Sequence, residues 1–147
     1  MTIKSIYLTF FLALFFINAL IASILTIEVK NIKNEKGQIL VALFDQEEGF
    51  PNNQNKAIRR KVGNIKNGKA TITFTNLPKG NYAAAIVHDL DNDSEIDKNW
   101  LGVPTEGYGF SMIGKPGLWI PTFKQSIFKI AEEIKKIQIK LYYSPFA

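Results

Sequence analysis

The sequence of 147 residues contains no cysteine and only one histidine, His88. Without cysteine, neither a disulfide nor a lipid-modified cysteine can stabilise or anchor the chain. A zinc site is disfavoured, because zinc usually takes histidine and cysteine ligands. A Ser–His–Asp arrangement would have to use His88 itself, and no G-x-S-x-G segment presents a serine. The sequence therefore gives little support to nucleophilic catalysis, and the domain must depend on its hydrophobic core.

The chain also lacks a long run of one charge sign. It has 18 basic and 13 acidic residues, for a net charge of +5. The densest basic run, "IRRK" at 58–61, is typical of an exposed edge strand whose charges discourage edge-to-edge pairing. A nucleic-acid surface would need a larger clustered basic patch, so we expect no nucleic-acid partner.

One long apolar run stands at the N-terminus. Lys4 is followed by apolar residues as far as Ala22, with small residues near the end of the run, which is typical of a secretory signal peptide. A retained membrane anchor is the alternative, since a spanning helix needs ~20 apolar residues, although Asn18 interrupts this run. We expect residues 1–23 to be a signal peptide and 24–147 a single periplasmic or secreted domain, with membrane contact only if the segment is retained.

Most of that domain alternates between apolar and polar residues with a period of two, which is typical of half-buried strands. Two other segments, "QILVALF" (38–44) and "YAAAIV" (82–87), are apolar on both faces and predict central strands. Turn signals such as Asn67-Gly68 separate the segments. The pattern predicts an all-β fold, a single antiparallel β-sandwich of about seven strands, prealbumin-like or Ig-like, with one long loop after the fifth strand (89–122). The other predicted strands are 25–32, 56–65, 69–77, 124–132 and 135–143.

An acidic run, "HDLDNDSEID", begins that loop at His88. Its carboxylates recur at every second position, as in oxygen-rich calcium loops. An EF-hand is excluded, because Ser94 stands where the loop needs glycine and Trp100 where it needs glutamate. A strand-end loop could still bind a cation if Glu106 or backbone carbonyls completed the shell, and the alternative is a solvated or Lys98-paired turn. The predicted ligands of Ca²⁺ or a similar hard cation are Asp89, Asp91, Asp93, Glu95 and Asp97.

Other residues near the loop suggest roles in ligand binding or loop orientation. His88 is predicted to be a hydrogen-bonded structural residue or to orient a carboxylate, on the strand face that carries Ile86. Trp100 and Trp119, with Tyr108 and Phe110, either cap the open end of the sandwich or form a platform for a glycan or peptide.

The glycines on either side of Tyr108 permit unusual backbone dihedrals or a close backbone approach. Carboxylate-pair chemistry by Asp97 and Glu106, with His88, is the enzymatic alternative.

Several segments together resemble a bacterial family, the domain of unknown function 2141. They include "GQILVALF", "NLPKGNYAAAIVHDLD", "EIDKNWLGVPTEGYGFS" and "IQIKLYY", and the resemblance covers nearly all of the predicted mature domain. The family pattern HD-x-[ND]-x-[ND]-G-x-[LI]-D is matched by His88, Asp89, Asp91, Asp93 and Asp97. Its glycine is replaced by Ser94, and Glu95 stands where lysine is frequent.

The resemblance implies a small, secreted or periplasmic β-sandwich without an assigned reaction. We therefore expect a non-enzymatic binding or structural module with a Ca²⁺-binding-like loop. Its partner would be an extracytoplasmic glycan, peptide or protein. A hydrolase or carbohydrate-active protein that uses the loop carboxylates is the alternative.

Overall fold

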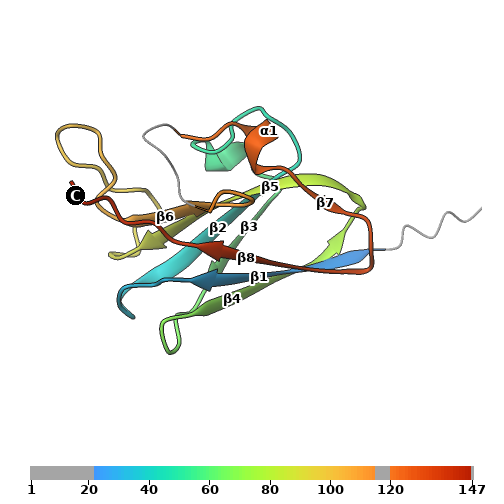
Figure 1. Ribbon diagram of the computed structural model, residues 1–147, viewed down its shortest axis with the longest axis horizontal. Coiled ribbons are helices and arrows are strands. Elements are labelled where there is room, and N and C mark those ends of the chain that lie inside the picture. The colour runs from blue at the N-terminus through green and yellow to red at the C-terminus, as the bar shows by residue number, and fades with distance from the viewer. Residues whose placement is uncertain (1–21, 115–119, 147) are drawn as a thin grey trace, which may run out of the picture.

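The alternating segments fold into strands that form two packed β-sheets (Figure 1). The computed structural model describes residues 22–114 and 120–146. It confirms the all-β sandwich. The predicted signal peptide, 1–23, lies almost entirely outside the described residues. Among the residues that are described, no helix is long and apolar enough to span a membrane.

The first sheet has the order β4-β1-β8. In it β1 (Ser23–Lys30) pairs antiparallel with β4 (Ala70–Leu77) and parallel with β8 (Ile134–Lys140). The parallel pair departs from the purely antiparallel prediction. Parallel neighbours need a long connection, and here the whole second sheet lies between β1 and β8 in the sequence. Alternation alone cannot reveal this, because it is the same for both strand directions.

The second sheet has the order β3-β2-β5-β6, and β7 pairs with the start of β5. Its central strands, β2 (Gln38–Phe44) and β5 (Gly80–Asp89), are buried along most of their length, as predicted from their continuous apolar runs. The outer partners are β3 (Arg59–Gly63) and β6 (Gly107–Phe110). Four of the five residues of β3 are exposed, as expected of an edge strand.

Two departures from the predicted strands follow from short elements. The loop predicted over 89–122 contains β6, so it divides into connections at 90–106 and 111–122. The strand predicted over 124–132 is instead helix α1 (Phe123–Ser126) followed by β7 (Phe128–Ile130). Thr122 caps α1 through a capping box with Gln125, a local signal that can start even one helical turn. A further short helix, η2 (Gln54–Lys56), lies between β2 and β3.

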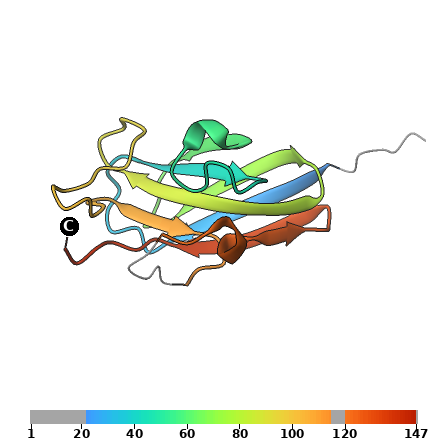
Figure 2. The ribbon, with the colours of Figure 1, turned by 90° about the horizontal axis from the view of Figure 1, so that it is seen from above.

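The close approach predicted for the glycines of β6 is confirmed. A Cβ on Gly109 would lie 2.9 Å from the Lys140 carbonyl oxygen, and one on Gly107 would clash with the Tyr143 ring. The chain after β8 crosses here and exchanges two backbone hydrogen bonds between Tyr142 and Tyr108, of 2.7 and 2.9 Å. The C-terminal segment therefore lies beside β6, at the same end of the molecule as the 90–106 loop (Figures 1 and 2).

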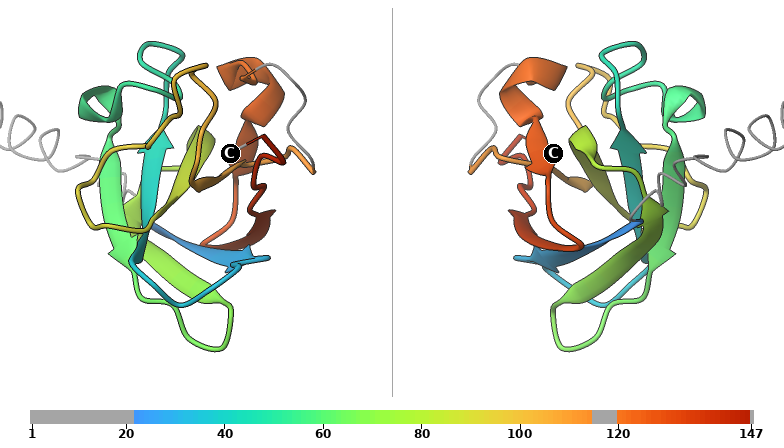
Figure 3. Two further views of the ribbon diagram at one scale, coloured as in Figure 1. Left: turned by 90° about the vertical axis from the view of Figure 1, so that its left-hand side faces the viewer. Right: turned by 90° about the vertical axis from the view of Figure 1, so that its right-hand side faces the viewer.

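The second sheet is apolar on both faces. Its inner face packs against the first sheet, and together they enclose the main core (Figure 3). Its outer face carries a second apolar cluster, in which Phe50 packs edge-on against Phe44 at a centroid distance of 5.3 Å. Strand β5 alternates between the two, so Ile86 faces the core and Ala85 faces outward. The outer cluster consists of Ala42, Phe44, Ala83, Ala85, Phe110 and Phe123.

Candidate functional site

The 90–106 loop leaves the sheet at the end of β5 and returns at the start of β6. These strands are antiparallel neighbours, and His88 pairs with Gly107 in their register. Asp89 and Glu106 lie next to this pair, one at each end of the loop. The pairing therefore brings two carboxylates together that are 17 positions apart in the sequence.

Asp91 completes a cluster of three carboxylates. One oxygen each of Asp89, Asp91 and Glu106 lies within 4.8 Å of the other two. Asp89 and Glu106 are buried, whereas Asp91 is exposed. Among the described residues, neither buried carboxylate forms an ion pair with a basic side chain. Oxygen donors this close, without nitrogen or sulfur, have the chemistry of a hard-cation site.

Asp89 organises the first turn of the loop. Its Oδ1 accepts a hydrogen bond from the Asn92 backbone N–H (2.8 Å), and its Oδ2 accepts from the Gln38 side chain (2.8 Å) and the Ser94 N–H (3.2 Å). Burial acts to raise the pKa of Asp89, but the hydrogen bonds from Gln38, Ser94, Asn92 and Asp93 outweigh it. The pKa of Asp89 therefore lies below its ordinary value, and the side chain is a carboxylate at neutral pH.

Glu106 holds the two ends of the loop together. Its Oε1 accepts from the Leu90 N–H at 2.6 Å, and its Oε2 accepts from the Asp97 N–H at 3.2 Å. Burial raises the pKa of Glu106 above its ordinary value despite these hydrogen bonds, and the charges of Asp97 and Asp89 add to the rise. The charged form of Glu106 is therefore less favourable in the folded protein than in water, and a nearby cation would offset part of this cost.

The remaining predicted ligands do not join this cluster. Asp93, Glu95 and Asp97 are exposed, and none belongs to the group of three. Asp93 instead accepts a hydrogen bond from the Glu95 N–H at 2.8 Å, within the turn. Glu106, which the sequence offered only as a completing group, occupies a central place because strand pairing brings it to Asp89. Metal binding itself stays a prediction.

Ser94, which replaces the glycine of the family pattern, adopts a backbone conformation that favours glycine. Its φ is +69°, in the left-handed region. In this turn the Ser94 N–H donates a hydrogen bond to Asp89. A serine in this conformation carries a steric cost that glycine would avoid.

His88 is buried in the sheet and has both ring nitrogens engaged. Nδ1 lies 2.8 Å from the Tyr143 hydroxyl, and Nε2 lies 2.8 Å from the Lys36 carbonyl oxygen. Nε2–H donates to the carbonyl, which can only accept, so Nδ1 accepts from the tyrosine when the ring is neutral. Beside it, a Cβ on Gly37 would clash with the Asp89 backbone, so the β1–β2 connection packs tightly under the loop. Both ring nitrogens of His88 are thus engaged in hydrogen bonds within the fold.

The aromatic residues of the loop separate into two groups. Trp100 is 90% exposed, so it does not cap the sandwich. Tyr108 is half-buried and packs edge-on against Phe110 and Tyr142. Trp119 lies outside the described residues, and the predicted platform of two tryptophans therefore stays a prediction.

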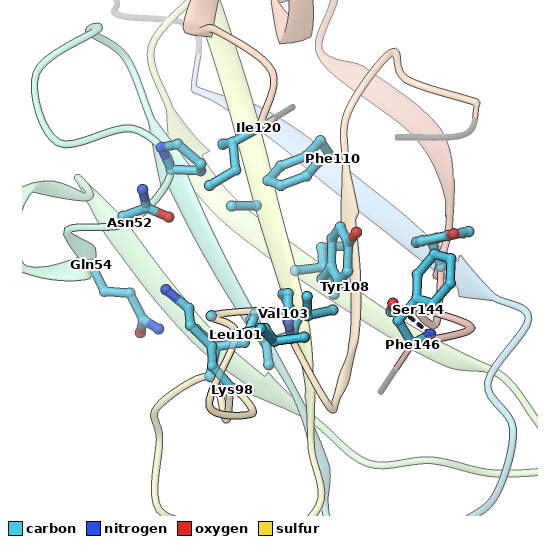
Figure 4. Close-up of a pocket in the computed structure, with 18 residues that line it drawn as sticks. Asn52, Gln54, Lys98, Leu101, Val103, Tyr108, Phe110, Ile120, Ser144 and Phe146 are labelled. Carbon is cyan, nitrogen blue, oxygen red and sulfur yellow. Dashed lines mark hydrogen bonds between the residues drawn. The ribbon is translucent and has the colours of Figure 1, made fainter. Parts of the chain in front are cut away.

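A groove on the outer face of the second sheet was not predicted from the sequence. Its volume is about 410 Å³, and it lies between the 90–106 loop, the β2–β3 connection and the C-terminal segment (Figure 4). Ala85, Val87, Tyr108 and Phe110 form part of its lining. The small outward-facing side chains of β5 were the one sign of it in the sequence. The groove itself is defined by the positions of the 90–106 loop, the β2–β3 connection and the C-terminal segment.

Comparison with known proteins identifies one family. The family model described as "Uncharacterized protein conserved in bacteria (DUF2141)" matches residues 27–138, which include most of both sheets and the carboxylate cluster. Neither the curated proteins nor the solved structures give a match. The match covers well over half of the chain and agrees with the resemblance of the motifs around His88 and Tyr108. The chain is therefore a member of this uncharacterised bacterial family, DUF2141.

Proposed function

We propose that this protein is a non-enzymatic, extracytoplasmic β-sandwich module whose 90–106 loop is held in place by a bound Ca²⁺ ion. The carboxylates of Asp89, Asp91 and Glu106 are the proposed ligands. The periplasmic or secreted location rests on the signal-peptide pattern of residues 1–23.

The observation that carries the proposal is the convergence of three carboxylates from both ends of one loop. Two of them are buried and form no ion pair with any basic side chain that the structure describes. Buried charges in proteins are normally paired or bound to a metal, because leaving water is costly. The hydrogen bonds to Asp89 and Glu106 replace part of the lost hydration, but backbone N–H groups carry no net positive charge. A divalent cation would offset the mutual repulsion of the cluster.

The donor set favours calcium over other metals. A carboxylate has about four lone-pair positions, and Glu106 uses two of them for the Leu90 and Asp97 amides. Glu106 thus keeps acceptor capacity, as does Asp91, which accepts one hydrogen bond, from the Asp93 N–H. Ca²⁺ takes 6–8 oxygens in flexible geometry and accepts waters, whereas Mg²⁺ demands near-octahedral coordination. With one exposed ligand, Asp91, the site would also remain accessible to solvent.

The enzymatic alternative receives less support from the geometry. His88 is buried, and both of its ring nitrogens are hydrogen-bonded, so it is not placed to contact a substrate. Asp97 approaches Glu106 with its backbone N–H, and both Glu106 oxygens accept backbone hydrogen bonds. An acid–base pair needs free carboxyl groups that face a common substrate. The non-enzymatic proposal is therefore preferred.

Thermal unfolding with and without calcium tests the proposed calcium clamp, meaning the Ca²⁺ ion bound by Asp89, Asp91 and Glu106. A ligand that binds only the folded state stabilises it by RT ln(1 + [L]/Kd), which is about 2.7 kcal/mol at a 100-fold excess over Kd. We expect the mature protein to melt roughly 5–10 °C higher in millimolar calcium than in chelator. Equal concentrations of magnesium should give a smaller rise.

A matched pair of variants locates the effect. Asp91→Asn removes the exposed ligand charge and should abolish most of the calcium-dependent rise. Asp93→Asn alters an exposed carboxylate of the same loop that lies outside the cluster and should leave the rise unchanged. The proposal is wrong if the parent protein shows no calcium shift, or if both variants respond like the parent.

A further inference from the structure

The groove exists because the outer face of the second sheet is only partly covered. Toward the start of β5, Ala83 packs in the outer cluster with Phe123, and the rings of Phe50 and Phe123 lie 5.8 Å apart. Farther along the same face, Ala85, which still belongs to the outer cluster, and Val87 line the groove. Their short side chains leave a hollow that none of the described aromatic residues fills.

The size and lining of the hollow are those of a small-ligand site. Small-molecule pockets usually measure about 300–1,000 Å³ and are lined mainly by apolar groups with a few polar ones. This groove, of about 410 Å³, has a mainly apolar lining. Three of its large apolar side chains are well exposed to solvent, namely Leu101 (62%), Ile120 (56%) and Phe146 (72%). Burial of these side chains under a bound ligand would contribute favourably to the free energy of binding.

The charge in the groove has one sign. Lys98 is its only charged lining residue among those that the structure describes, and no described carboxylate lines it. Lys98 is exposed and is not in either of the ion pairs found in the described chain, so its ammonium group is available. Figure 4 shows the side chains of Asn52, Gln54 and Lys98 on one side of the groove, with Tyr108 and Phe110 across from them.

We infer that this groove binds a small amphipathic carboxylate, a molecule with an aliphatic or aromatic body and one anionic head. The body lies over Ala85 and Val87, and the head is bound by Lys98 with the amide groups of Asn52 and Gln54. An apolar floor selects the body, and the single positive group beside two amide donors selects an anionic head over a cationic one.

This inference goes beyond the proposed calcium clamp and does not depend on it. The two sites share the 90–106 loop, of which Ile96, Lys98 and residues 101–104 line the groove. The carboxylate cluster lies at the base of that loop and contributes no lining residue. Binding is therefore measured both in calcium and in chelator, so that failure of the clamp and failure of the groove give different results.

The test uses decanoate and its uncharged counterpart 1-decanol as probes. Both are titrated by displacement of the fluorescent apolar dye N-phenyl-1-naphthylamine from the mature protein. We expect decanoate to displace the dye at lower concentration than decanol. The order should be the same in calcium and in chelator.

Four variants separate the head from the body of the ligand. Lys98→Met should weaken decanoate binding about two- to fivefold, as for a partly solvated charge pair, and leave decanol unchanged. Lys98→Arg should keep the preference for decanoate. Lys79→Met, an exposed lysine outside the groove, is the matched control and should bind like the parent. Val87→Thr places a hydroxyl on the floor with little change of shape and should weaken both probes.

Three results would overturn the inference. The first is that decanoate fails to bind in both calcium and chelator. The second is that decanoate and decanol bind equally and Lys98→Met affects neither, which would mean an apolar groove without anion recognition. The third is a protein dimer, seen by sedimentation, that dissociates as the dye binds, because a second copy would then be the natural occupant.

Discussion

The two faces of β5 are built from adjacent residues but are covered very differently. On the inner face every side chain meets the opposite sheet or the segments next to it, and even the polar His88 has both nitrogens hydrogen-bonded. On the outer face the cover thins along the strand, from a closed aromatic cluster at Ala83 to the groove at Val87 and the carboxylates at Asp89. The inner face of β5 thus contributes to the hydrophobic core, whereas its outer face borders the two candidate sites.

The strongest test of this comparison mutates neighbouring residues on opposite faces. Ile86 is 1% exposed in the main core, so Ile86→Ala should cost about 2–5 kcal/mol of unfolding free energy through lost burial and a residual cavity. Val87 is half-buried beside the groove, and Val87→Ala should cost less than about 1 kcal/mol, because solvent already reaches it. Urea denaturation measures both. Similar losses at the two positions would contradict the contrast between the faces.

The next largest effect is expected at the end of the outer face. Asp89→Ala leaves the Asn92 and Ser94 amides and the Gln38 side chain without their acceptor, and should cost about 2–4 kcal/mol. Asp93→Ala alters an exposed aspartate that accepts only local hydrogen bonds and should cost less than about 0.5 kcal/mol. Unfolding curves that rank the two variants in the opposite order would show that Asp89 does not organise the turn.

The two buried carboxyl groups should give opposite pH dependence. The pKa of Asp89 is lowered in the folded state, so its contribution is present above the ordinary carboxyl pKa and is lost as the pH falls through the lowered value. The pKa of Glu106 is raised, so its contribution is present below the ordinary value and is lost as the pH rises through the raised one. In chelator, the Glu106→Gln variant should therefore lack the decrease in stability just above the ordinary glutamate pKa.

Denaturation at a series of pH values measures this difference. The quantity to compare is the slope of the unfolding free energy against pH. The absolute values differ for another reason as well, because glutamine replaces one acceptor oxygen of Glu106. Calcium should reduce the decrease in the parent protein, since a cation replaces the proton. Parallel profiles for the parent and Glu106→Gln would contradict the account of Glu106.

The smallest expected effect is a gain in stability at the turn. Ser94→Gly relieves the left-handed backbone of Ser94, at φ +69°, and keeps the N–H that donates to Asp89. The relief of about 1 kcal/mol is partly cancelled by the greater freedom of glycine in the unfolded chain. A net gain of roughly 0.5 kcal/mol should appear as a higher urea midpoint. A clear loss would mean that the serine hydroxyl has a role that this turn geometry does not explain.

These contrasts also show which parts of the fold the sequence predicts. The period of two identified most strands, and the continuous apolar runs placed β2 and β5 at the centre of a sheet, because such runs need cover on both faces. The parallel pairing of β1 with β8 was missed, since pairing partners lie more than a hundred residues apart and leave no local pattern. The strand β6 was missed because four residues with two glycines look like a loop.

The candidate site was predictable only in its local part. The acidic run located the loop, and Asp89 and Asp91 belong to the observed cluster. The place of Glu106 follows from the register of β5 with β6, and the sequence alone does not contain that register. Asp93, Glu95 and Asp97 share the spacing of the ligands but are exposed, and Asp93 instead accepts a local hydrogen bond from the Glu95 N–H. The groove depends on three segments distant in sequence and was not predictable.

The most direct test of the clamp follows amide hydrogen exchange along the chain. If Glu106 and a bound cation hold the loop at both of its ends, calcium should slow exchange across 90–106, most of all at Leu90 and Asp97, whose N–H groups donate to Glu106. Exchange of the core-facing residues of β5, such as Ile86, should change far less under native conditions. Equal exchange of the loop in calcium and in chelator would contradict the account.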